Sequence, residues 1–585
     1  MTPNAAEPII DEAETRRDQM FPKLDEHELS RIAPYGAVHQ FQLGDKLVSA
    51  GVAVPGMYVI LAGSVTIVQR DGMGKTIPVI SQGRGGFLGE VSTLAGRPAL
   101  VDVVADMDVE ARLIARDRLR SLIVVEAELG QRLMRALVLR RAALITAAAS
   151  GPVLLGRPDG AAMVRLQNFL RRNGQPHHVV DSASDAASAR LLTDYGVDAS
   201  QVLVCCANGA VLVDPTEAEL ARCIGMLDNL AREQLFDVAI VGAGPAGLST
   251  AVYAASEGLE VVMLDGRSIG GQAGASARIE NYFGFPTGVS GEALTGRGYA
   301  QAQKFGADML IPARISMLEC ERAGVQGELV LLLTDGRVIR ARTVVVATGA
   351  MYRRPALAGL SAFEGRGVWY WASPVEGNVC KGVDVVLVGG GNSAGQAAVF
   401  LSRFASRVHV LVRSAGLASS MSSYLVERLQ AISNISIHPH SELTSLRGDE
   451  DGQLAGVVWR DRANGVAHAH DIRNVFLFVG ADPETDWLAG CSVALDDKGF
   501  VVTGRASATH GFRRAGALES SVPGVFAVGD VRAGSTKRIG AAIGEGAAVV
   551  SQIHEFLGSA SVISPSTPHL AMRNSWTNSH PLASS

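Results

Sequence analysis

The feature that most constrains this chain is a strand–glycine loop–helix pattern that occurs twice. FDVAIVGAGPAGLSTAVYAASEGLEVVMLDG spans residues 236–266, and VDVVLVGGGNSAGQAAVFLSRFASRVHVLVRS spans residues 383–414. In each copy an apolar strand runs into closely spaced glycines, and a helix of small residues follows at once. This order predicts a nucleotide-binding βαβ unit, because the glycines permit a tight turn and bring a pyrophosphate close to the helix N-terminus. The repetition predicts an internal duplication of that unit.

The two copies differ where the ribose of a nucleotide would lie. In the first copy Gly242, Gly244 and Gly247 fill the three positions of the fingerprint, and Asp265 ends the second strand. An acid at that position is placed to accept a hydrogen bond from a ribose 2′-hydroxyl. The first site therefore suits FAD or NAD.

The second copy has Gly389, Gly391 and Ala394 in the same three roles. Val412 stands where the first copy has Asp265, and Arg413 follows it. A nearby arginine can accommodate a 2′-phosphate, so the second site favours NADPH, with NADH left open. The alternative for Arg413 is a solvated surface side chain.

Composition excludes several classes of protein. The chain has 585 residues, a net charge of −5 and 47% apolar residues. The charge argues against nucleic acid as a partner, and no apolar run reaches the ~18 residues of a membrane span. The N-terminus has no signal-peptide pattern, and six cysteines are too few for a secreted disulfide scaffold. We therefore expect a cytoplasmic, multidomain, globular protein with no metal site.

Further domains are predicted on either side of the first copy. Residues 20–149 carry short β-branched runs and then a long helical stretch from about Asp117 to Ala149, which predicts a β-domain with a C-terminal helix. Residues 150–232 show the order β-α-β-α-β-β-α, which fits a thioredoxin-like fold; its first helix is predicted over 161–172, with Met163, Leu166, Phe169 and Leu170 on one side. That unit has no cysteine after its first strand, where GRPDG stands. Residues 558–585 are rich in Ser, Pro and His and predict a flexible tail.

Five more motifs surround the glycine loops. They are GGQAG (270–274), RIENYFGFP (278–286), VVVATGA (344–350), GVFAVGD (524–530) and STKRIGAAIGEG (535–546). Together with the loops they resemble the low-molecular-weight thioredoxin reductases, class II of the pyridine nucleotide-disulfide oxidoreductases, over about residues 234–557. The resemblance implies an FAD-binding domain in two parts, 235–352 and 473–557, around an NAD(P)H-binding domain at 353–472. It also implies two Rossmann-like folds.

The same resemblance implies which residues hold each cofactor. Those for FAD would be Gly242, Gly244, Gly247, Asp265, Gly271, Gln272, Asn281, Gly349, Gly529, Asp530, Arg538 and Ile539. Those for NADPH would be Gly389, Gly391, Asn392, Ser393, Ala394 and Arg413. The family usually carries further basic residues for the 2′-phosphate, and here only Arg413 matches.

The disulfide chemistry of that family rests on a CxxC that this chain lacks. At the matching place it reads WYWASPVEGNVCKG (369–382), with Trp371 and Pro374 in the two cysteine positions and Cys380 alone nearby. No two of the other cysteines show CxxC spacing. We interpret Trp371 as the candidate catalytic residue, because it could cap the flavin where a cysteine would lie; ordinary packing between domains is the alternative.

The N-terminal β-domain resembles a cyclic nucleotide-binding domain with a jelly-roll fold. GFLGEVSTLAGRPALVDVVA (86–105) resembles its phosphate-binding cassette, with Gly89 and Glu90 matching the Gly-Glu pair. The phosphate-binding arginine normally follows the cassette proline, but here Ala99 follows it and Arg97 precedes it. Asp102 adds a negative charge where a small hydroxyl residue is common. Cyclic nucleotide is therefore the less favoured partner, and a β-barrel used for dimerisation is favoured slightly.

Three functions remain open at this stage. The first is an NAD(P)H-dependent flavin oxidoreductase that passes hydride from NADPH to FAD and then electrons to a non-dithiol acceptor, such as ferredoxin, flavodoxin, a quinone or a small oxidant. The second is a redox- or nucleotide-responsive flavoprotein sensor with little turnover. The third is a true thioredoxin reductase that uses atypical cysteines such as Cys205 and Cys206. We expect a homodimer in each case.

Overall fold

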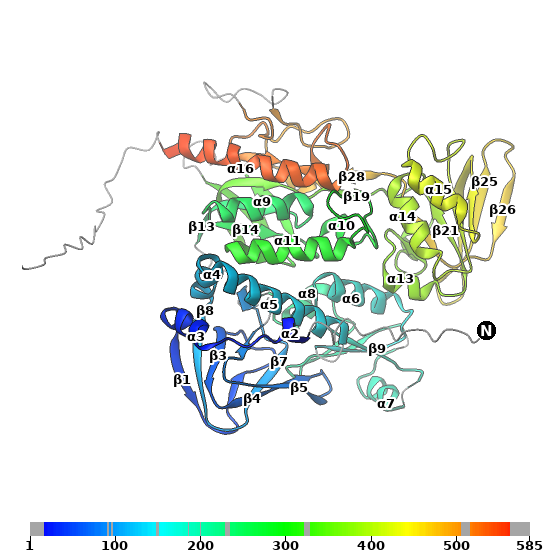
Figure 1. The fold of residues 1–585 in the computed structure, drawn as a ribbon. Helices are drawn as coiled ribbons and strands as arrows, with labels where there is room; N and C mark the ends of the chain where they lie inside the picture. Colours follow the sequence, from blue (N-terminus) through cyan, green and yellow to red (C-terminus); the bar gives the residue numbers. More distant parts are fainter. Residues whose placement is uncertain are drawn as a thin grey trace, which may run out of the picture.

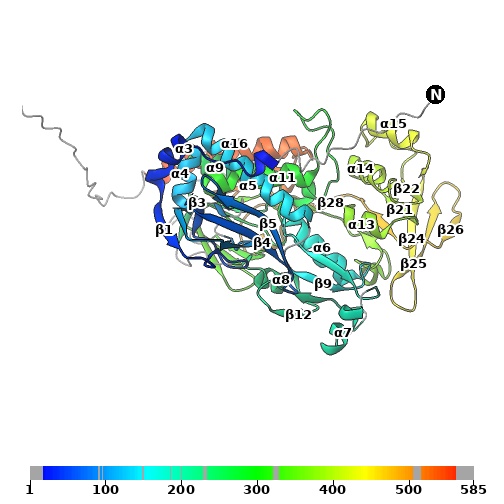
Figure 2. The same ribbon diagram turned by 60° about the horizontal axis from the view of Figure 1, so that its bottom comes forward.

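The computed structural model describes residues 17–89, 93–94, 97–147, 151–184, 186–198, 200–227, 234–320, 328–504 and 515–561. It shows the predicted multidomain architecture, with a β-sandwich and a small α/β unit lying against two dinucleotide-type α/β units (Figures 1 and 2). Glu90 and the predicted tail from residue 562 onward lie outside the described residues. No helix in the described ranges combines the length and apolar character that crossing a membrane requires.

The N-terminal unit is a sandwich of two four-stranded sheets, with strand orders β1-β8-β3-β6 and β2-β7-β4-β5. In β4 buried and half-buried residues alternate, as expected for a strand that turns one face to a core. The elements are α2 (Arg17–Met20), α3 (Glu26–Ile32), η1 (Ala33–Tyr35), β1 (Ala37–Phe41), β2 (Lys46–Val48), β3 (Gly56–Ala62), β4 (Ser64–Arg70), β5 (Thr76–Gly83), β6 (Phe87–Leu88), β7 (Val101–Ala105), β8 (Val109–Ala115), α4 (Arg116–Val125) and α5 (Ala127–Ala147).

The predicted long helix is two helices, α4 and α5, that meet at Glu126. Glu126 has φ −93° and ψ 73°, which ends α4, and its carboxylate accepts a hydrogen bond from Arg31 Nε at 3.0 Å. The helices cross closely at Gly130, where a Cβ would lie 2.2 Å from the carbonyl oxygen of Ile123. The prediction of one continuous helix was therefore wrong. The helical spacing of apolar residues continues through Glu126, but the contact with Arg31 fixes a break in the backbone there.

The second unit has a four-stranded sheet of order β10-β9-β11-β12. Strands β9 and β10 are parallel, and β11 pairs antiparallel with both β9 and β12, which is the topology the thioredoxin-like prediction requires. Helix α6 covers residues 161–172 as predicted and buries Met163, Leu166, Phe169 and Leu170. The elements are β9 (Val153–Gly156), α6 (Ala161–Arg172), β10 (His178–Asp181), α7 (Ala186–Asp194), β11 (Leu203–Cys205), β12 (Val211–Val213) and α8 (Glu217–Cys223).

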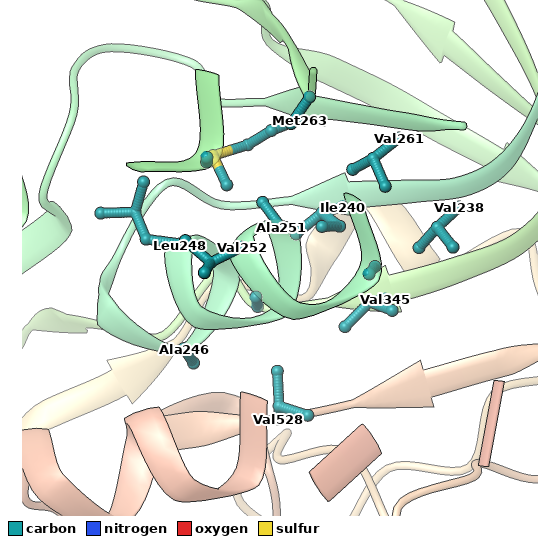
Figure 3. Close-up of a cluster of buried hydrophobic side chains, with 14 of the residues drawn as sticks. Val238, Ile240, Ala246, Leu248, Ala251, Val252, Val261, Met263, Val345 and Val528 are labelled. Carbon is teal, nitrogen blue, oxygen red and sulfur yellow. The ribbon is translucent and has the colours of Figure 1, made fainter. Parts of the chain in front are cut away.

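The third unit holds the first glycine loop and is completed by the C-terminal part of the chain. Its sheet has the order β15-β14-β13-β18-β17-β16, and β29 pairs parallel with β18. Helix α9 packs on the sheet through Ala251 and Val252, opposite Val238 and Ile240 (Figure 3). The elements are β13 (Leu235–Val241), α9 (Pro245–Ser256), β14 (Val261–Leu264), α10 (Gly271–Gly274), α11 (Gly291–Phe305), β15 (Asp308–Leu310), β16 (Ile315–Glu319), β17 (Leu329–Leu333), β18 (Val338–Val346), η3 (Asp486–Leu488), β29 (Val525–Ala527), η5 (Gly529–Val531) and α16 (Ile539–Ser561).

The fourth unit holds the second glycine loop. Its parallel sheet has the order β20-β27-β21-β22-β23, and a three-stranded antiparallel sheet, β24-β25-β26, lies beside it. Two short strands, β19 (Ala350–Tyr352) and β28 (Ala481–Pro483), pair where the chain passes between the third and fourth units. The elements are α12 (Leu360–Phe363), β20 (Val368–Trp369), α13 (Pro374–Val379), β21 (Asp384–Val388), α14 (Asn392–Leu401), β22 (Arg407–Leu411), α15 (Ser423–Ala431), β23 (Ile435–His438), β24 (Ser441–Gly448), β25 (Leu454–Asp461), β26 (Ala467–His470) and β27 (Val475–Leu477).

Two predicted boundaries differ from the structure. Strand β27 is a central strand of the fourth unit, so that unit continues past its predicted end at residue 472. Helix α16 continues to Ser561, past the predicted domain end at residue 557. Both differences arise because strand pairing and helix packing, rather than local composition, decide where a unit ends.

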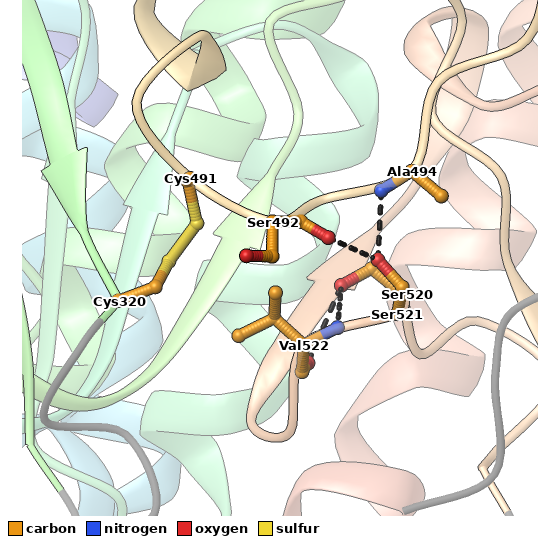
Figure 4. The surroundings of a disulfide bond; sticks show 7 residues. All are labelled: Cys320, Cys491, Ser492, Ala494, Ser520, Ser521 and Val522. Carbon is orange, nitrogen blue, oxygen red and sulfur yellow. Dashed lines mark hydrogen bonds between the residues drawn. A yellow bond between two sulfur atoms is a disulfide. The ribbon is translucent and has the colours of Figure 1, made fainter.

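Four of the six cysteines form disulfides that the sequence analysis did not predict. Cys206 pairs with Cys223 inside the thioredoxin-like unit. Cys320 pairs with Cys491 and joins the two parts of the split third unit across a separation of 171 residues (Figure 4). Cys205 and Cys380 are free and buried. No short spacing motif marks either pair, so the sequence offered no signal for them.

Candidate functional site

The first glycine loop joins β13 to α9, and its backbone conformation and close contacts leave no room for a side chain at Gly242 or Gly247. Gly242 has φ +114°, and a Cβ there would lie 2.3 Å from the carbonyl oxygen of Ala347. A Cβ on Gly247 would lie 1.9 Å from the carbonyl oxygen of Gly242, so α9 packs directly on the loop. Gly244 is the N-cap of α9, and among the described residues only the Gly271 Cα, at 4.0 Å, comes that near to a Cβ built on it. The loop therefore leaves room for a phosphate at a helix N-terminus.

A second loop faces the first one. It carries the short helix α10, and a Cβ on Gly271 would lie 3.1 Å from the Gly244 Cα. The side-chain amide of Gln272 donates a hydrogen bond to the carbonyl oxygen of Ala350, where β19 begins. The predicted FAD residues Gly244, Gly271 and Gln272 thus come together in the folded chain.

Asp265 follows β14 and organises the turn beside the first loop. Its carboxylate accepts hydrogen bonds from the backbone N–H groups of Ala243, Arg267 and Ser268, each at 2.9 Å. A carboxylate offers about four acceptor positions, so about one remains for a ligand hydroxyl. Asp265 borders the cavity described below, which is compatible with the ribose contact that the sequence predicts.

Asp530 is a half-buried acid whose carboxylate has no donor among the described residues. Among the described residues no side chain or backbone N–H donates to its carboxylate, and Lys537 Nζ donates instead to its backbone carbonyl. Burial raises the pKa of the Asp530 carboxyl above its ordinary value, which Lys537 opposes and Glu545 reinforces. A half-buried carboxylate that lines a cavity can accept further hydrogen bonds, and the hydroxyl groups of a ribityl chain would supply them. This observation fits bound FAD.

The second glycine loop has the same backbone design. Gly389 has φ +147°, and a Cβ there would lie 2.5 Å from the carbonyl oxygen of Phe478. Asn392 accepts a hydrogen bond from the backbone N–H of Ser422 at 2.8 Å, and Ser393 bonds to the Tyr352 hydroxyl. Gly391 caps α14 with open space around it, which again leaves room for a phosphate.

Arg413 lies apart from these groups. It is exposed at the end of β22, beyond the buried Val412. Its guanidinium is near Glu442, whose carboxylate Arg460 and Arg462 already bind. The 2′-phosphate role of Arg413 stays a prediction.

One cavity of about 1280 Å³ brings most of the predicted residues together. That volume exceeds the ~300–1,000 Å³ of a usual ligand pocket, as a site for two dinucleotides requires. Among the predicted residues it is lined by Gly242, Gly244, Asp265, Gly271, Gln272, Asn281, Gly349, Trp371, Asn392, Ser393, Asp530, Arg538 and Ile539. The remaining predicted cofactor residues, which shape turns or lie outside the lining, are Gly247, Gly389, Gly391, Ala394, Arg413 and Gly529.

Trp371 lies between the two dinucleotide units. Its indole N–H donates to Glu376 Oε1 at 3.0 Å, and the Arg267 guanidinium lies 4.9 Å from its ring centroid. Glu376 also closes the N-terminus of α13, where Ser373 and Glu376 form a capping box. Trp371 is therefore held from both units and borders the cavity. Both interpretations of this residue, a flavin-facing group and an interface contact, agree with that position.

The thioredoxin-like unit supplies site residues that the sequence analysis missed. Asn168 Nδ2 donates to Glu376 Oε1 at 2.6 Å, and Arg172 donates to the carbonyl oxygen of Gly271 at 2.6 Å. Burial, with the nearby charge of Arg267, lowers the pKa of Arg172 to about 10. The Ser373-x-x-Glu376 spacing is a local signal for the capping box. No local signal links Asn168 to a glutamate 208 residues away.

Residues of the resembled cyclic nucleotide cassette contact other parts of the chain. The Arg97 guanidinium lies 5.6 Å from the ring centroid of Tyr299 on α11, so it faces the third unit. Gly89 is held by Arg140, which donates to its carbonyl oxygen at 3.1 Å. The cavity beside Arg97 measures about 40 Å³ and is walled by the segment around Gly225, where a Cβ would lie 2.4 Å from the Pro98 ring. The role of Arg97 as a nucleotide ligand stays a prediction.

Asp102, another residue of the same cassette, is buried. Its buried carboxylate accepts from the backbone N–H of Ala50 at 2.9 Å and pairs with Lys46 at 3.3 Å and Arg70 at 3.2 Å. Lys46 and Arg70, the cations that could bind a phosphate here, are therefore already paired with a carboxylate of the chain itself.

Two glycine-loop units that share one cavity define a two-dinucleotide oxidoreductase architecture. The pyridine nucleotide-disulphide oxidoreductase family model matches residues 236–546, slightly more than half of the chain. The cyclic nucleotide-binding domain model matches residues 38–125. The chain belongs to the pyridine nucleotide-disulphide oxidoreductase family and carries a cyclic nucleotide-binding domain. Membership confirms the predicted enzyme class, an NAD(P)H-dependent flavin oxidoreductase, and the predicted cofactors FAD and NADPH.

Individual relatives resemble the two dinucleotide units. The chain is 33% identical over 300 residues to a thioredoxin reductase of Mycolicibacterium smegmatis, covering 51% of this chain and 89% of that protein. It is 30% identical over 331 residues to an alkyl hydroperoxide reductase subunit of Escherichia coli K12, covering 56% of this chain and 60% of that protein. The solved thioredoxin reductase of T. acidophilum aligns with a TM-score of 0.50 at 30% identity, over 56% of this chain and 100% of that one.

Proposed function

We propose that this enzyme oxidises NADPH at the shared cavity and passes the electrons to an acceptor without an internal dithiol. One observation carries the proposal: all six cysteines lie in described residues, and none lines the cavity. Trp371 and Pro374 stand where the resembled reductases carry their CxxC. A dithiol relay needs a thiolate beside the flavin, and the cavity offers none.

The cysteine nearest to that place is unsuited to the role. Cys380 ends α13 and is fully buried, and burial raises the pKa of its thiol well above the usual range. A thiol, unlike a thiolate, is a poor nucleophile. Burial also raises the pKa of the Cys205 thiol in the thioredoxin-like unit.

The chain's own residues would position both cofactors. The glycine loops at Gly242 and Gly389 would receive the two pyrophosphates, and Asp530 would accept hydrogen bonds from the ribityl chain. When bound, NADPH supplies a hydride and FAD accepts it. Trp371 would exclude water from the face where the dithiol of the resembled family would lie.

The predicted acceptors are a redox protein such as ferredoxin or flavodoxin, a quinone or a small oxidant. Anaerobic mixing of the FAD-loaded enzyme with NADPH should bleach the flavin absorbance within the first turnover. Addition of a non-disulfide acceptor should then restore the absorbance and sustain turnover. A Trp371→Cys, Pro374→Cys variant is the matched control, because it restores the family's spacing. If wild type reduced thioredoxin as well as that variant does, the proposal would be wrong.

Disulfide reduction is the second candidate function, because the thioredoxin-like unit carries the Cys206–Cys223 disulfide. The similarity to a thioredoxin reductase and to an alkyl hydroperoxide reductase subunit also favours it. A Cys206→Ser, Cys223→Ser variant separates the two candidates. Loss of NADPH-dependent disulfide reduction with unchanged flavin bleaching would favour this second function. The sensor alternative and the predicted homodimer stay predictions.

A further inference from the structure

The thioredoxin-like unit covers the segment of the fourth unit that contains Trp371. Helix α6 lies against α13 in both views (Figures 1 and 2). Val164 of α6 is buried in the same apolar cluster as Trp369, Ala372 and Cys380 of the fourth unit. This contact joins two hydrophobic cores rather than two solvated surfaces.

A buried polar network reinforces that contact. Asn168 is 2% exposed and Glu376 is fully buried, and their side chains are 2.6 Å apart. Ser373 Oγ donates to Asn168 Oδ1 at 3.3 Å, and the Trp371 indole shares the Glu376 carboxylate. Separating α6 from α13 would leave a buried acid without its amide donor, which opposes undocking.

The same unit is also fixed to the FAD side of the cavity. Arg172 donates to the Gly271 carbonyl, and Asn173 Nδ2 donates to the Arg267 carbonyl at 3.0 Å. Glu217 at the start of α8 pairs with Arg267 at 3.1 Å. The thioredoxin-like unit therefore spans both dinucleotide units and forms a third wall of the cavity.

The cysteine-free loop of the thioredoxin-like unit faces this cavity. Arg157, Asp159 and Gly160, within the GRPDG segment that precedes α6, line it together with Trp371. The two segments that lack redox cysteines thus border the same space. The place where a folded partner would approach α13 is already taken by a domain of the chain itself.

We propose that the thioredoxin-like unit is a resident cap that keeps folded proteins from this site, so that the acceptor is a small planar molecule of the quinone class. The proposal rests on the proposed function and names its acceptor. A folded 100-residue domain has a radius of gyration of about 13 Å, far too large for the cavity. The aromatic residues Trp371, Tyr370 and Tyr282 line the cavity, and Arg267 brings a cation beside Trp371.

The overall reaction balances without a thiol. NADPH gives up a hydride from its nicotinamide ring, which carries two electrons and one proton. With one further proton from solvent, these convert a quinone into a hydroquinone and leave NADP⁺. No cysteine is oxidised or reduced in this sequence.

The test compares a naphthoquinone sulfonate with oxidised flavodoxin and ferredoxin as acceptors of the full-length, FAD-loaded enzyme. In wild type kcat/KM for the quinone should exceed that for either protein by roughly 100-fold. A Val164→Asp, Asn168→Ala variant should undock the cap, which hydrogen exchange at α6 and α13 reports. It should raise the ratio of kcat/KM for the protein acceptors to kcat/KM for the quinone by roughly tenfold. Gln167→Ala, on a half-exposed position of the same helix, is the matched control and should change neither.

Two results would overturn the cap. One is a wild-type enzyme that reduces flavodoxin or ferredoxin as readily as the quinone. The other is an undocked variant, verified by hydrogen exchange, with no gain for the protein acceptors. If the variant loses its FAD through misfolding, the wild-type ratio of the acceptors decides alone. If NADPH fails to bleach the flavin in wild type, the proposed function itself fails, which distinguishes that failure from a wrong cap.

Discussion

Replacement of Gly242 by alanine tests whether the first glycine loop is constrained as the structure indicates. The backbone there has φ +114°, which disfavours an L-residue by about 1–2 kcal/mol. The new Cβ would also lie 2.3 Å from the Ala347 carbonyl oxygen and 2.5 Å from its carbon, both backbone atoms of β18's continuation. Overpacking of this kind costs about 1–3 kcal/mol. Together these effects predict a loss of roughly 2–5 kcal/mol in the free energy of unfolding.

Gly258→Ala isolates the first of these two contributions. Gly258 has φ +87°, but no atom lies within 4 Å of its would-be Cβ. This variant should therefore lose only about 1–2 kcal/mol. Both variants gain the same small reduction in unfolded-chain entropy, which cancels in the comparison.

The assay is thermal unfolding followed by FAD release, with FAD content measured on the purified protein. For a unit of this size a loss of 1 kcal/mol lowers Tm by about 2–4 °C. Gly242→Ala should melt well below Gly258→Ala and bind FAD with reduced stoichiometry. If the two variants melted together and both retained full FAD, the close approach at Gly242 would not constrain the loop, and the reasoning would be refuted.

Three further predictions concern other parts of the chain. Burial raises the pKa of Asp530, so the folded state binds its proton more tightly than the unfolded chain, and stability is lost as pH rises from ordinary aspartate values through the raised pKa. Asp530→Asn should therefore raise Tm of FAD-free protein at neutral pH but not at strongly acidic pH, and should weaken FAD binding in titrations. Asp102→Ser should destabilise the β-sandwich by about 1–3 kcal/mol in thermal unfolding. Because it frees Lys46 and Arg70, it should bind cyclic AMP more tightly than wild type does in calorimetry, and tighter binding by wild type would contradict our account of the cassette. Cys320→Ser with Cys491→Ser should lower stability by about 4–5 kcal/mol, since the disulfide closes a long loop; an unchanged Tm would show that it contributes nothing.

Local signals were sufficient for the parts of the fold that local physics determines. The glycine loops at Gly242 and Gly389 need positive φ, and a helix follows each at the predicted place. Helix α6 was predicted to the residue, because its apolar face follows a strict helical period. Several predicted residues that line the cavity follow the carboxyl ends of parallel strands, among them Gly242 after β13, Asp265 after β14 and Asp530 after β29.

Features that depend on contacts between distant segments could not be predicted. The break at Glu126 depends on Arg31 and on a helix crossing, neither of which periodicity reports. The orientation of Arg97 depends on Tyr299, which lies in another domain. The docking of Asn168 on Glu376 joins residues 208 positions apart with no shared motif.

At three places this chain has its own side chains where the resembled families bind a partner or carry a reactive group. Asp102 gives Lys46 and Arg70 an internal anion in the nucleotide cassette. Trp371 takes the place of a cysteine and is held by Glu376 and Arg267. The first helix of the thioredoxin-like unit packs on that same segment. At each place a contact within the chain stands where the resembled families bind a partner or carry a reactive group. Each of these contacts joins two elements of the folded chain. The interfaces therefore gain fixed geometry from the same residues that remove the expected chemistry, and the contacts of Trp371 and α6 border the cavity in which we propose that the remaining chemistry takes place.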